Sequence, residues 1–249
     1  MNVSASPPLP PSHSRNGAPA AGAVAVTKTR ILDAAEKLFG QKGFDATSLR
    51  DITTEAQVNL AAVNYHFQSK DSLIDAVIER RIRPVNQQRM EMLRTAGTGA
   101  SVEQIVEAYL CPLLKMEALP AVPLIGRALS NPDQFFERVY KRHMQEVAEG
   151  FAEAIGRARP ALPRKECLWR LQFMAGSMSH VLALSAALPR MMGNPGQPLD
   201  RVALIRRLTE FLSAGLCAPY SGAAAARKTA RKAVAKPMKR ATSRGREKE

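Results

Sequence analysis

The amino-acid sequence predicts an all-α protein. Hydrophobic residues make up 45% of its 249 residues but aromatic residues only 5%, so the core must consist mainly of small and medium-sized aliphatic side chains. Apolar residues recur at helical spacing through most of the chain, and no stretch of useful length alternates as a half-buried strand does. The chain is long enough for one or two domains with a substantial core.

Composition divides the chain into four parts. Residues 1–26 are rich in proline, alanine, serine and glycine and carry one charge, Arg15, so we expect a disordered leader. Residues 27–83 hold closely spaced short helical patterns, and residues 84–220 hold longer ones that prolines interrupt near their ends. Residues 221–249 contain ten Lys or Arg, two Glu and almost no large apolar residue, which predicts a basic disordered tail.

Residues 27–83 are expected to form a compact head, and the first two of its helices have identifiable ends. Thr27 can cap the first helix, and Gly43 can end it by taking a left-handed conformation. Thr47 or Ser48 can cap the second helix. The apolar residues expected on the inner faces of these two helices are Ile31, Leu32, Ala35, Leu38, Phe39, Leu49, Ile52 and Ala56.

A three-residue turn, residues 57–59, separates the second helix from a third helix over residues 60–66. Asn59 can cap this third helix, and Ser69 can cap a fourth. The residues expected to face the core from the turn and the third helix are Val58, Val63 and Phe67. Two short helices around such a turn have the layout of a helix-turn-helix, which places its second helix in a DNA groove.

The outward face of the third helix carries groups suited to DNA. Ala61 and Ala62 are small enough for the backbone to approach DNA closely, Tyr65 and His66 can donate to phosphates, and Asn64 can reach a base edge. Phosphates can also be held at the starts of neighbouring helices, where the available groups belong to Thr47, Ser48 and Lys70. Tyr65 and His66 taken singly also fit the rim of a helical bundle, but the turn, the caps and the spacing together favour DNA binding.

The charge of the chain qualifies this interpretation. The formal net charge is +14, of which the tail supplies +8 and residues 27–83 only +1, so the high charge is weak support for sequence-specific binding. We find no catalytic motif, membrane span or signal peptide, and we expect no enzyme activity, cofactor or metal. The cysteines, Cys111, Cys167 and Cys217, lie far apart and are expected to be buried thiols of a reduced cytoplasm. We therefore expect a cytoplasmic protein that associates with the nucleoid when bound to DNA.

Residues 28–82 resemble the N-terminal domain of TetR-type (TetR/AcrR) one-component transcriptional regulators. The matching stretches are ILDAAEKLF, KGFDATSLRDI and VNYHFQSK. The resemblance implies a homodimer whose two heads bind successive major grooves of a palindromic operator. It places the DNA contacts on Thr47, Arg50, Ala61, Ala62, Tyr65, His66 and Lys70, and to these we add Ser48, Asn59 and Asn64. The chain has Gln57 where the family usually has a glycine, so a non-glycine residue must take the left-handed turn conformation.

The resemblance also implies a helical ligand-binding and dimerisation domain after about residue 84. Residues 163–189 and 199–216 would pair with their copies as a four-helix bundle. NLAAVNYHF and NPDQFFERVY resemble fatty-acid-responsive members, so the expected effector is largely apolar, such as a fatty acid or acyl derivative. The candidate pocket residues are Met116, Leu124, Arg127, Phe135, Val139, His143, Trp169 and Phe173. The protein would then be a repressor that this effector releases from DNA.

A second hypothesis stays open. The Ala/Lys/Arg-rich tail resembles the extensions of nucleoid proteins, so the chain could bind DNA without sequence preference through this tail. The tail could also act as a solubilising extension.

Overall fold

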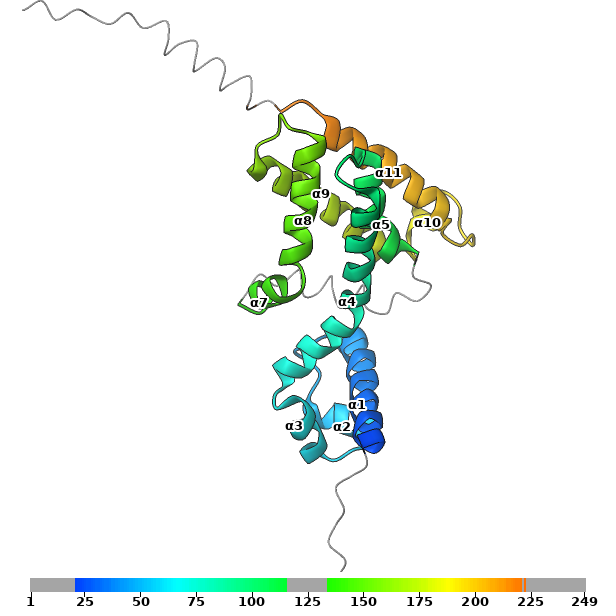
Figure 1. Cartoon of the computed structure of the whole chain (residues 1–249). Coiled ribbons are helices and arrows are strands. Elements are labelled where there is room, and N and C mark those ends of the chain that lie inside the picture. The colour runs from blue at the N-terminus through cyan, green and yellow to red at the C-terminus, as the bar shows by residue number, and fades with distance from the viewer. Residues whose placement is uncertain (1–20, 116–133, 221, 223–249) are drawn as a thin grey trace, which may run out of the picture. The chain divides into compact units, whose positions relative to one another are not determined.

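The computed structural model describes residues 21–115, 134–220 and 222, and every regular element in this part of the chain is an α-helix (Figure 1). The all-α prediction is therefore confirmed. In chain order the helices are α1 (Ala21–Lys42), α2 (Leu49–Ala56), α3 (Leu60–Phe67), α4 (Lys70–Ala96), α5 (Val102–Leu114), α7 (Gln134–His143), α8 (Gln145–Ala158), α9 (Arg164–Ala183), α10 (Leu188–Met191) and α11 (Arg201–Cys217).

The chain forms two compact units, which divide between Ile78 and Glu79 inside α4. In the N-terminal unit α1, α2 and α3 contact one another, and their apolar faces meet in one core. Its most deeply buried side chains include Ile31, Phe39, Ile52, Val63 and Leu73. Val63 and Phe67 of α3 are both buried, as predicted, so the opposite face of this helix is turned away from the core.

The first helix starts earlier than expected. It begins at Ala21, and Thr27 lies inside it with its hydroxyl donating to the carbonyl of Ala23 at 2.9 Å. The predicted start at Thr27 is therefore corrected, because the alanine-rich stretch before Thr27 has the helix propensity to continue the helix. The predicted end is confirmed: Gly43 has φ 90° and its N–H donates to the carbonyl of Phe39.

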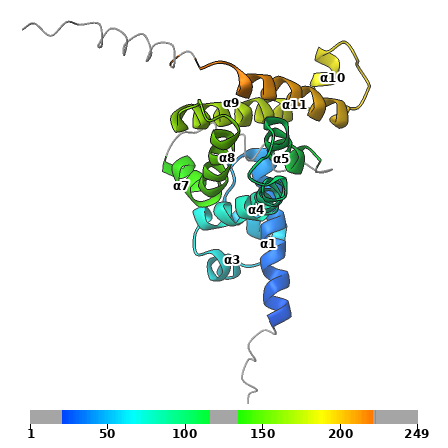
Figure 2. The same cartoon turned by 45° about the horizontal axis from the view of Figure 1, so that its top comes forward.

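The core of the C-terminal unit lies among α5, α8, α9 and α11. α11 packs on α5, α8 packs on α9, and α11 also contacts α9; Figure 2 shows α9 and α11 running close together. Their shared core is large and mainly aliphatic. Its most buried members include Ile105, Leu110, Leu114, Phe151, Ile155 and Met174.

Several predicted segments of this unit are subdivided. Within the longer helical patterns expected over residues 84–220, Met144 separates α7 from α8, and the predicted segment 163–189 ends as a regular helix at Ala183. Cys111 and Cys167 are buried, and burial raises the pKa of both thiols. Cys217 is exposed, contrary to expectation, because it ends α11 on the side away from the core. Within the described part of the chain, no helix has an apolar stretch long enough to cross a bilayer.

Candidate nucleic-acid interface

The start of α2 is fixed by a reciprocal cap. The hydroxyl of Ser48 accepts from the N–H of Asp51 at 3.1 Å, and a carboxylate oxygen of Asp51 accepts from the N–H of Ser48 at 2.9 Å. This backbone bond, followed by the bond from the Ser48 hydroxyl, lowers the pKa of the Asp51 carboxyl below its ordinary value. The two residues satisfy donors that a helix start leaves without an intrahelical partner.

The turn between α2 and α3 has the conformation that the sequence requires. Gln57 has φ 52° and ψ 49°, a left-handed geometry that confirms the prediction for this non-glycine position. The guanidinium of Arg30 on α1 donates to the carbonyls of Ala56 at 2.6 Å and Gln57 at 3.2 Å. Since these bonds hold the end of α2 against α1, the direction in which α3 leaves the turn is also constrained.

The exposed face of α3 is made of small and neutral polar side chains. Asn59 caps the helix, its side-chain oxygen accepting from the N–H of Ala62 at 2.8 Å. Ala61 and Asn64 are exposed, and Tyr65 is 75% exposed. The half-buried ring of His66 lies 5.2 Å from the Tyr65 ring in an edge-on contact. A phenol, an amide and an imidazole on one short helix can donate to phosphates and reach base edges.

Among the other predicted DNA contacts, three have exposed or partly exposed side chains and one is buried. Ser48 and Arg50 are exposed at the start of α2, and Lys70 is partly exposed, with Nζ donating to the Asp45 carbonyl at 3.4 Å. Thr47 is fully buried, and its hydroxyl donates to the Gly43 carbonyl at 2.7 Å. The side chain of Thr47 therefore holds the loop between α1 and α2 and does not reach the surface. The sequence could not separate Thr47 from Ser48, because both adjacent residues are good caps.

Of the eight predicted pocket residues, the structure describes the side chains of four, and these four are divided between α7 and α9. Met116, Leu124, Arg127 and the side chain of Phe135 lie outside the described part of the chain. Val139 is buried on α7, and the backbone carbonyl of His143 accepts from Asn86 at 2.6 Å. Trp169 and Phe173 lie on the outside of α9, where they are 52% and 62% exposed. Their rings are stacked, with centroids 5.9 Å apart.

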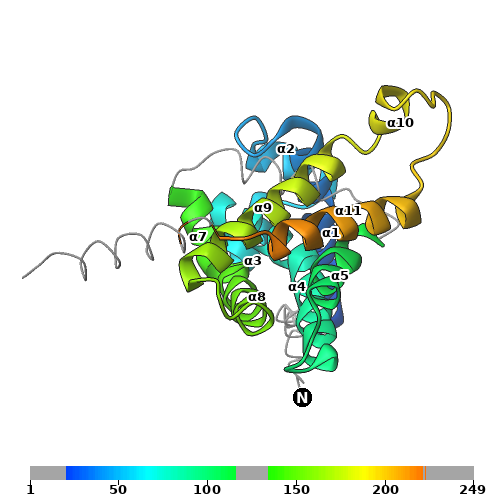
Figure 3. The ribbon, with the colours of Figure 1, turned by 90° about the horizontal axis from the view of Figure 1, so that it is seen from above.

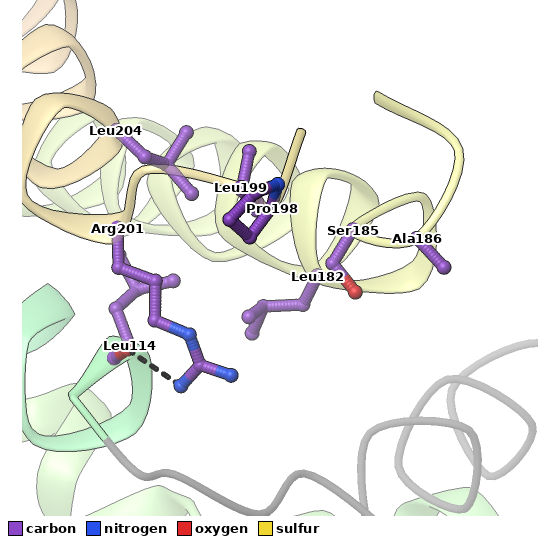
Figure 4. A pocket seen from close by; sticks show the side chains of 8 residues that line it. All are labelled: Leu114, Leu182, Ser185, Ala186, Pro198, Leu199, Arg201 and Leu204. Atoms are coloured by element: carbon purple, nitrogen blue, oxygen red, sulfur yellow. Dashed lines mark hydrogen bonds between the residues drawn. The ribbon is translucent and has the colours of Figure 1, made fainter. Parts of the chain in front are cut away.

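The C-terminal unit contains a cavity of about 260 Å³ that the sequence did not indicate. The ends of α5 and α9 and the start of α11 form it, and its lining is Leu114, Leu182, Ser185, Ala186, Pro198, Leu199, Arg201 and Leu204. Figure 4 shows Arg201 beside Leu114, to whose carbonyl it donates at 3.4 Å, with Ser185 and Ala186 on the opposite side. These residues are distant in sequence and belong to helix ends, where hydrophobic periodicity gives little signal.

Sequence comparisons identify relatives of both units. Residues 31–77 match a family described as "Bacterial regulatory proteins, tetR family", and residues 107–215 match a "Tetracyclin repressor-like, C-terminal domain". The probable HTH-type transcriptional regulator YttP of Bacillus subtilis is 33% identical over 84 residues, which are 34% of this chain and 39% of that protein. The HTH-type transcriptional repressor KstR2 of Rhodococcus jostii is 37% identical over 51 residues, 20% of this chain and 25% of that protein. The aligned segments thus span well under half the length of these relatives.

A structural comparison extends over both units. The structure of the fatty acid degradation regulator FadR from Bacillus halodurans has a TM-score of 0.58 at 15% identity, covering 78% of this chain and 97% of that one. At this identity the likeness shows the fold. The two family matches together span more than half of the chain, and their order agrees with the two units of the structure. This chain therefore belongs to the TetR family of bacterial transcriptional regulators.

Proposed function

We propose that the protein is a homodimeric transcriptional repressor that binds a palindromic operator through α3 and is released by a small, largely apolar effector. The observation that carries the proposal is the exposed face of α3, held by caps at Ser48 and Asn59 and by the bonds from Arg30 to the turn. KstR2, to which the head is similar, is named a repressor, which favours repression over activation.

In this proposal α3 lies in the major groove of B-DNA. Tyr65 and His66 donate to phosphates and position the helix, while Asn64 reads a base edge and Ala61 and Ala62 contact thymine methyl groups. The surrounding residues contribute further phosphate contacts, and they are Ser48, Arg50, Asn59 and Lys70. Most of these contacts are neutral, so sequence preference depends on fit more than on charge.

The dimer interface proposed here is formed by α9 and α11. Large apolar side chains are exposed on both helices: Trp169 and Phe173 on α9, and Val202 and Phe211, 80% and 70% exposed, on α11. Figure 3 shows the two helices next to each other, so one partner can cover both. Large exposed apolar surfaces mark interaction sites, and a second copy would bury these side chains in a four-helix bundle.

The cavity in the C-terminal unit supports an effector site. Its lining is mainly leucine, alanine and proline with one guanidinium and one hydroxyl, which suits an apolar molecule with a single polar group. A fatty acid or acyl derivative has this chemistry. Release from DNA requires that the effector bind more tightly to the conformation that does not fit the operator, with a coupling of typically about 1–3 kcal/mol.

The test of DNA recognition is fluorescence anisotropy with the intergenic DNA upstream of the protein's own gene and a shuffled sequence of the same length. We expect the full chain to prefer the native fragment at 150 mM salt, and Asn64→Ala to reduce this preference. Asn194→Ala, the same substitution at an exposed residue of the C-terminal unit, serves as the control. Equal binding of native and shuffled DNA would instead support the nucleoid-type function of the basic tail.

The test of assembly is sedimentation equilibrium of the full chain. We expect a dimer, and we expect Phe211→Glu to yield monomers because a buried, unpaired carboxylate is costly. Glu210→Gln, an exposed neighbour on α11, should leave the dimer intact. A wild-type monomer at micromolar concentration would contradict this part of the proposal.

A further inference from the structure

A positive charge is buried inside the C-terminal unit. Arg89 on α4 is only 3% exposed. Its Nε donates to the carbonyl of Tyr109 at 2.9 Å, and its guanidinium carbon lies 4.0 Å from the centre of the Tyr109 ring. Nη1 donates to the side-chain oxygen of Asn86 at 3.2 Å, and Nη2 faces the sulfur of Met178 at 3.5 Å.

The charge of Arg89 has no carboxylate partner among the described residues, since the groups that accept from it are all neutral. Arg170, another buried arginine of this unit, is paired with Glu166 at 2.9 Å. Burial lowers the pKa of Arg89, yet a guanidinium keeps its proton in proteins. An uncompensated buried cation costs several kcal/mol, and a neutral side chain would cross-link the same helices at lower cost.

The bonds of Arg89 leave one edge of the guanidinium weakly occupied. The Nε bond and the Tyr109 ring fix the plane of the group. The opposite edge, formed by Nη1 and Nη2, meets a long bond to an amide oxygen and a contact to a thioether, which is a weak acceptor. Two parallel N–H groups on such an edge match the two oxygens of a carboxylate. The Met178 side chain is flexible enough to give way to one.

The two helices that hold this edge, α5 and α9, also carry residues that line the cavity of Figure 4. Met178 and Leu182 are one turn apart on α9, and Tyr109 and Leu114 are five residues apart on α5, separations of roughly 6 and 7.5 Å along the helix axes. Leu182 and Leu114 line the cavity, whereas Met178 and Tyr109 contact Arg89. Thus α5 and α9 each carry one residue that lines the cavity and one that contacts the guanidinium of Arg89.

We propose that Arg89 binds the carboxylate of the effector, whose apolar part occupies the cavity between α5, α9 and α11. The inference rests on the proposed effector control and adds the charge of the effector and the residue that recognises it. Bound carboxylate replaces Met178 at the Nη1–Nη2 edge and neutralises the buried charge. Because Asn86 joins Arg89 to the end of α7, and Met178 belongs to α9, binding changes contacts on several helices together.

The first experiment needs no ligand. Met178→Glu supplies a carboxylate at the sulfur position, and Met178→Gln is its neutral control of the same size. We expect Met178→Glu to bind the native intergenic DNA at least tenfold more weakly than Met178→Gln, because it imitates the effector-bound state. We also expect Met178→Glu to melt at a higher temperature than the double variant with Arg89→Gln, which leaves the carboxylate unpaired. Equal DNA affinities and equal melting temperatures would overturn the proposal.

The second experiment measures binding without DNA, so it separates failure of this inference from failure of operator recognition. Isothermal titration compares sodium decanoate with 1-decanol, which has the same chain without the charge. We expect wild type to bind decanoate at least tenfold more tightly than decanol, Arg89→Gln to lose this difference, and the control Arg206→Gln, which changes an exposed arginine of α11, to keep it. If Arg89→Gln keeps the difference and Arg201→Gln loses it, the carboxylate binds Arg201 and the proposal is overturned. If wild type binds neither probe, the comparison of Met178→Glu with Met178→Gln decides.

Discussion

Nη1 of Arg170 on α9 donates a hydrogen bond of 2.8 Å to the carbonyl of Leu216 near the end of α11. The same nitrogen is also within bonding distance of the carbonyls of Gly215 and Ala218, and Nε is paired with Glu166. The last carbonyls of a helix have no intrahelical partner and carry partial negative charge. A buried guanidinium at this position therefore fastens the end of α11 to α9, the two helices that we propose to form the dimer interface.

Arg170→Met should lower the free energy of unfolding by about 2–4 kcal/mol. The substitution keeps much of the apolar volume but leaves carbonyls of α11 and the carboxylate of Glu166 without their donor. Urea denaturation measures this loss. Both proteins are compared at the same concentration, because the apparent stability of a dimer rises with protein concentration.

The control for Arg170 is Arg206→Met. Arg206 is exposed on α11 and lies 3.5 Å from Glu210, and exposed ion pairs contribute little. We expect a change within about 0.5 kcal/mol. Similar losses in both variants would show that Arg170 contributes no more than a surface arginine does.

Gln57→Gly should stabilise the N-terminal unit by up to about 1 kcal/mol. Gln57 holds φ 52°, a conformation that costs other residues about 1–2 kcal/mol and glycine almost nothing, while the greater freedom of glycine in the unfolded chain offsets part of the gain. Gln57→Val should destabilise, because a β-branched residue fits this conformation poorly. Thermal unfolding of wild type, Gln57→Gly and Gln57→Val ranks the three proteins by melting temperature. A higher melting temperature for Gln57→Val than for wild type would contradict the left-handed conformation of residue 57.

The cap at the start of α2 should make stability depend on pH. The pKa of Asp51 is lower in the folded protein than in the unfolded chain, where it is about 3.9. Its stabilising contribution is therefore complete above the unfolded value and is lost as the pH falls through the folded value. Wild type should exceed Asp51→Asn in melting temperature at pH 7, and the difference should shrink below about pH 4. A difference that is constant with pH would show that the bonds to Ser48 do not depend on the charge of Asp51.

The head was predictable from sequence to the level of single residues because its signals are local. Gly43, Ser48, Asn59 and Ser69 each act on backbone groups within a few positions, and each ends or caps a helix in the structure as expected. The start of α1 was missed because its first turn has no polar cap and only alanine-rich helix propensity to mark it.

The C-terminal unit was predictable only as a set of helices. Helical periodicity identifies an apolar face but not what covers it, so Trp169 and Phe173 could be placed in a pocket when the structure has them exposed on α9. The burial of Arg89 had no signal either, since a single arginine on a charged helix usually faces solvent. The exposure of Trp169 and Phe173 and the burial of Arg89 both depend on which helices become neighbours. Contacts between residues distant in sequence determine that arrangement.

Tyr65→Phe should weaken operator binding without changing stability. Tyr65 is 75% exposed and its hydroxyl is proposed to donate to a phosphate, so its removal should cost about 1 kcal/mol, or five- to tenfold in affinity. Native and shuffled fragments should lose affinity by a similar factor, because a phosphate contact carries no sequence information. Anisotropy gives both affinities, and an unchanged melting temperature excludes misfolding. A loss confined to the native fragment would instead assign Tyr65 to a base.

Removal of residues 221–249 should separate the two sources of DNA affinity. This segment supplies ten Lys or Arg and two Glu but none of the residues of the α3 surface. Binding of phosphates by the tail would release counterions, so removing the tail should lower affinity for native and shuffled DNA alike. It should also reduce the slope of log K against log salt by about 0.9 for each phosphate that the tail had neutralised. The preference for native DNA should persist, because α3 and not the tail reads the bases. These effects are measured as affinities for native and shuffled DNA between about 50 and 200 mM salt. If the truncated chain no longer prefers native DNA, the tail is the principal DNA-binding element.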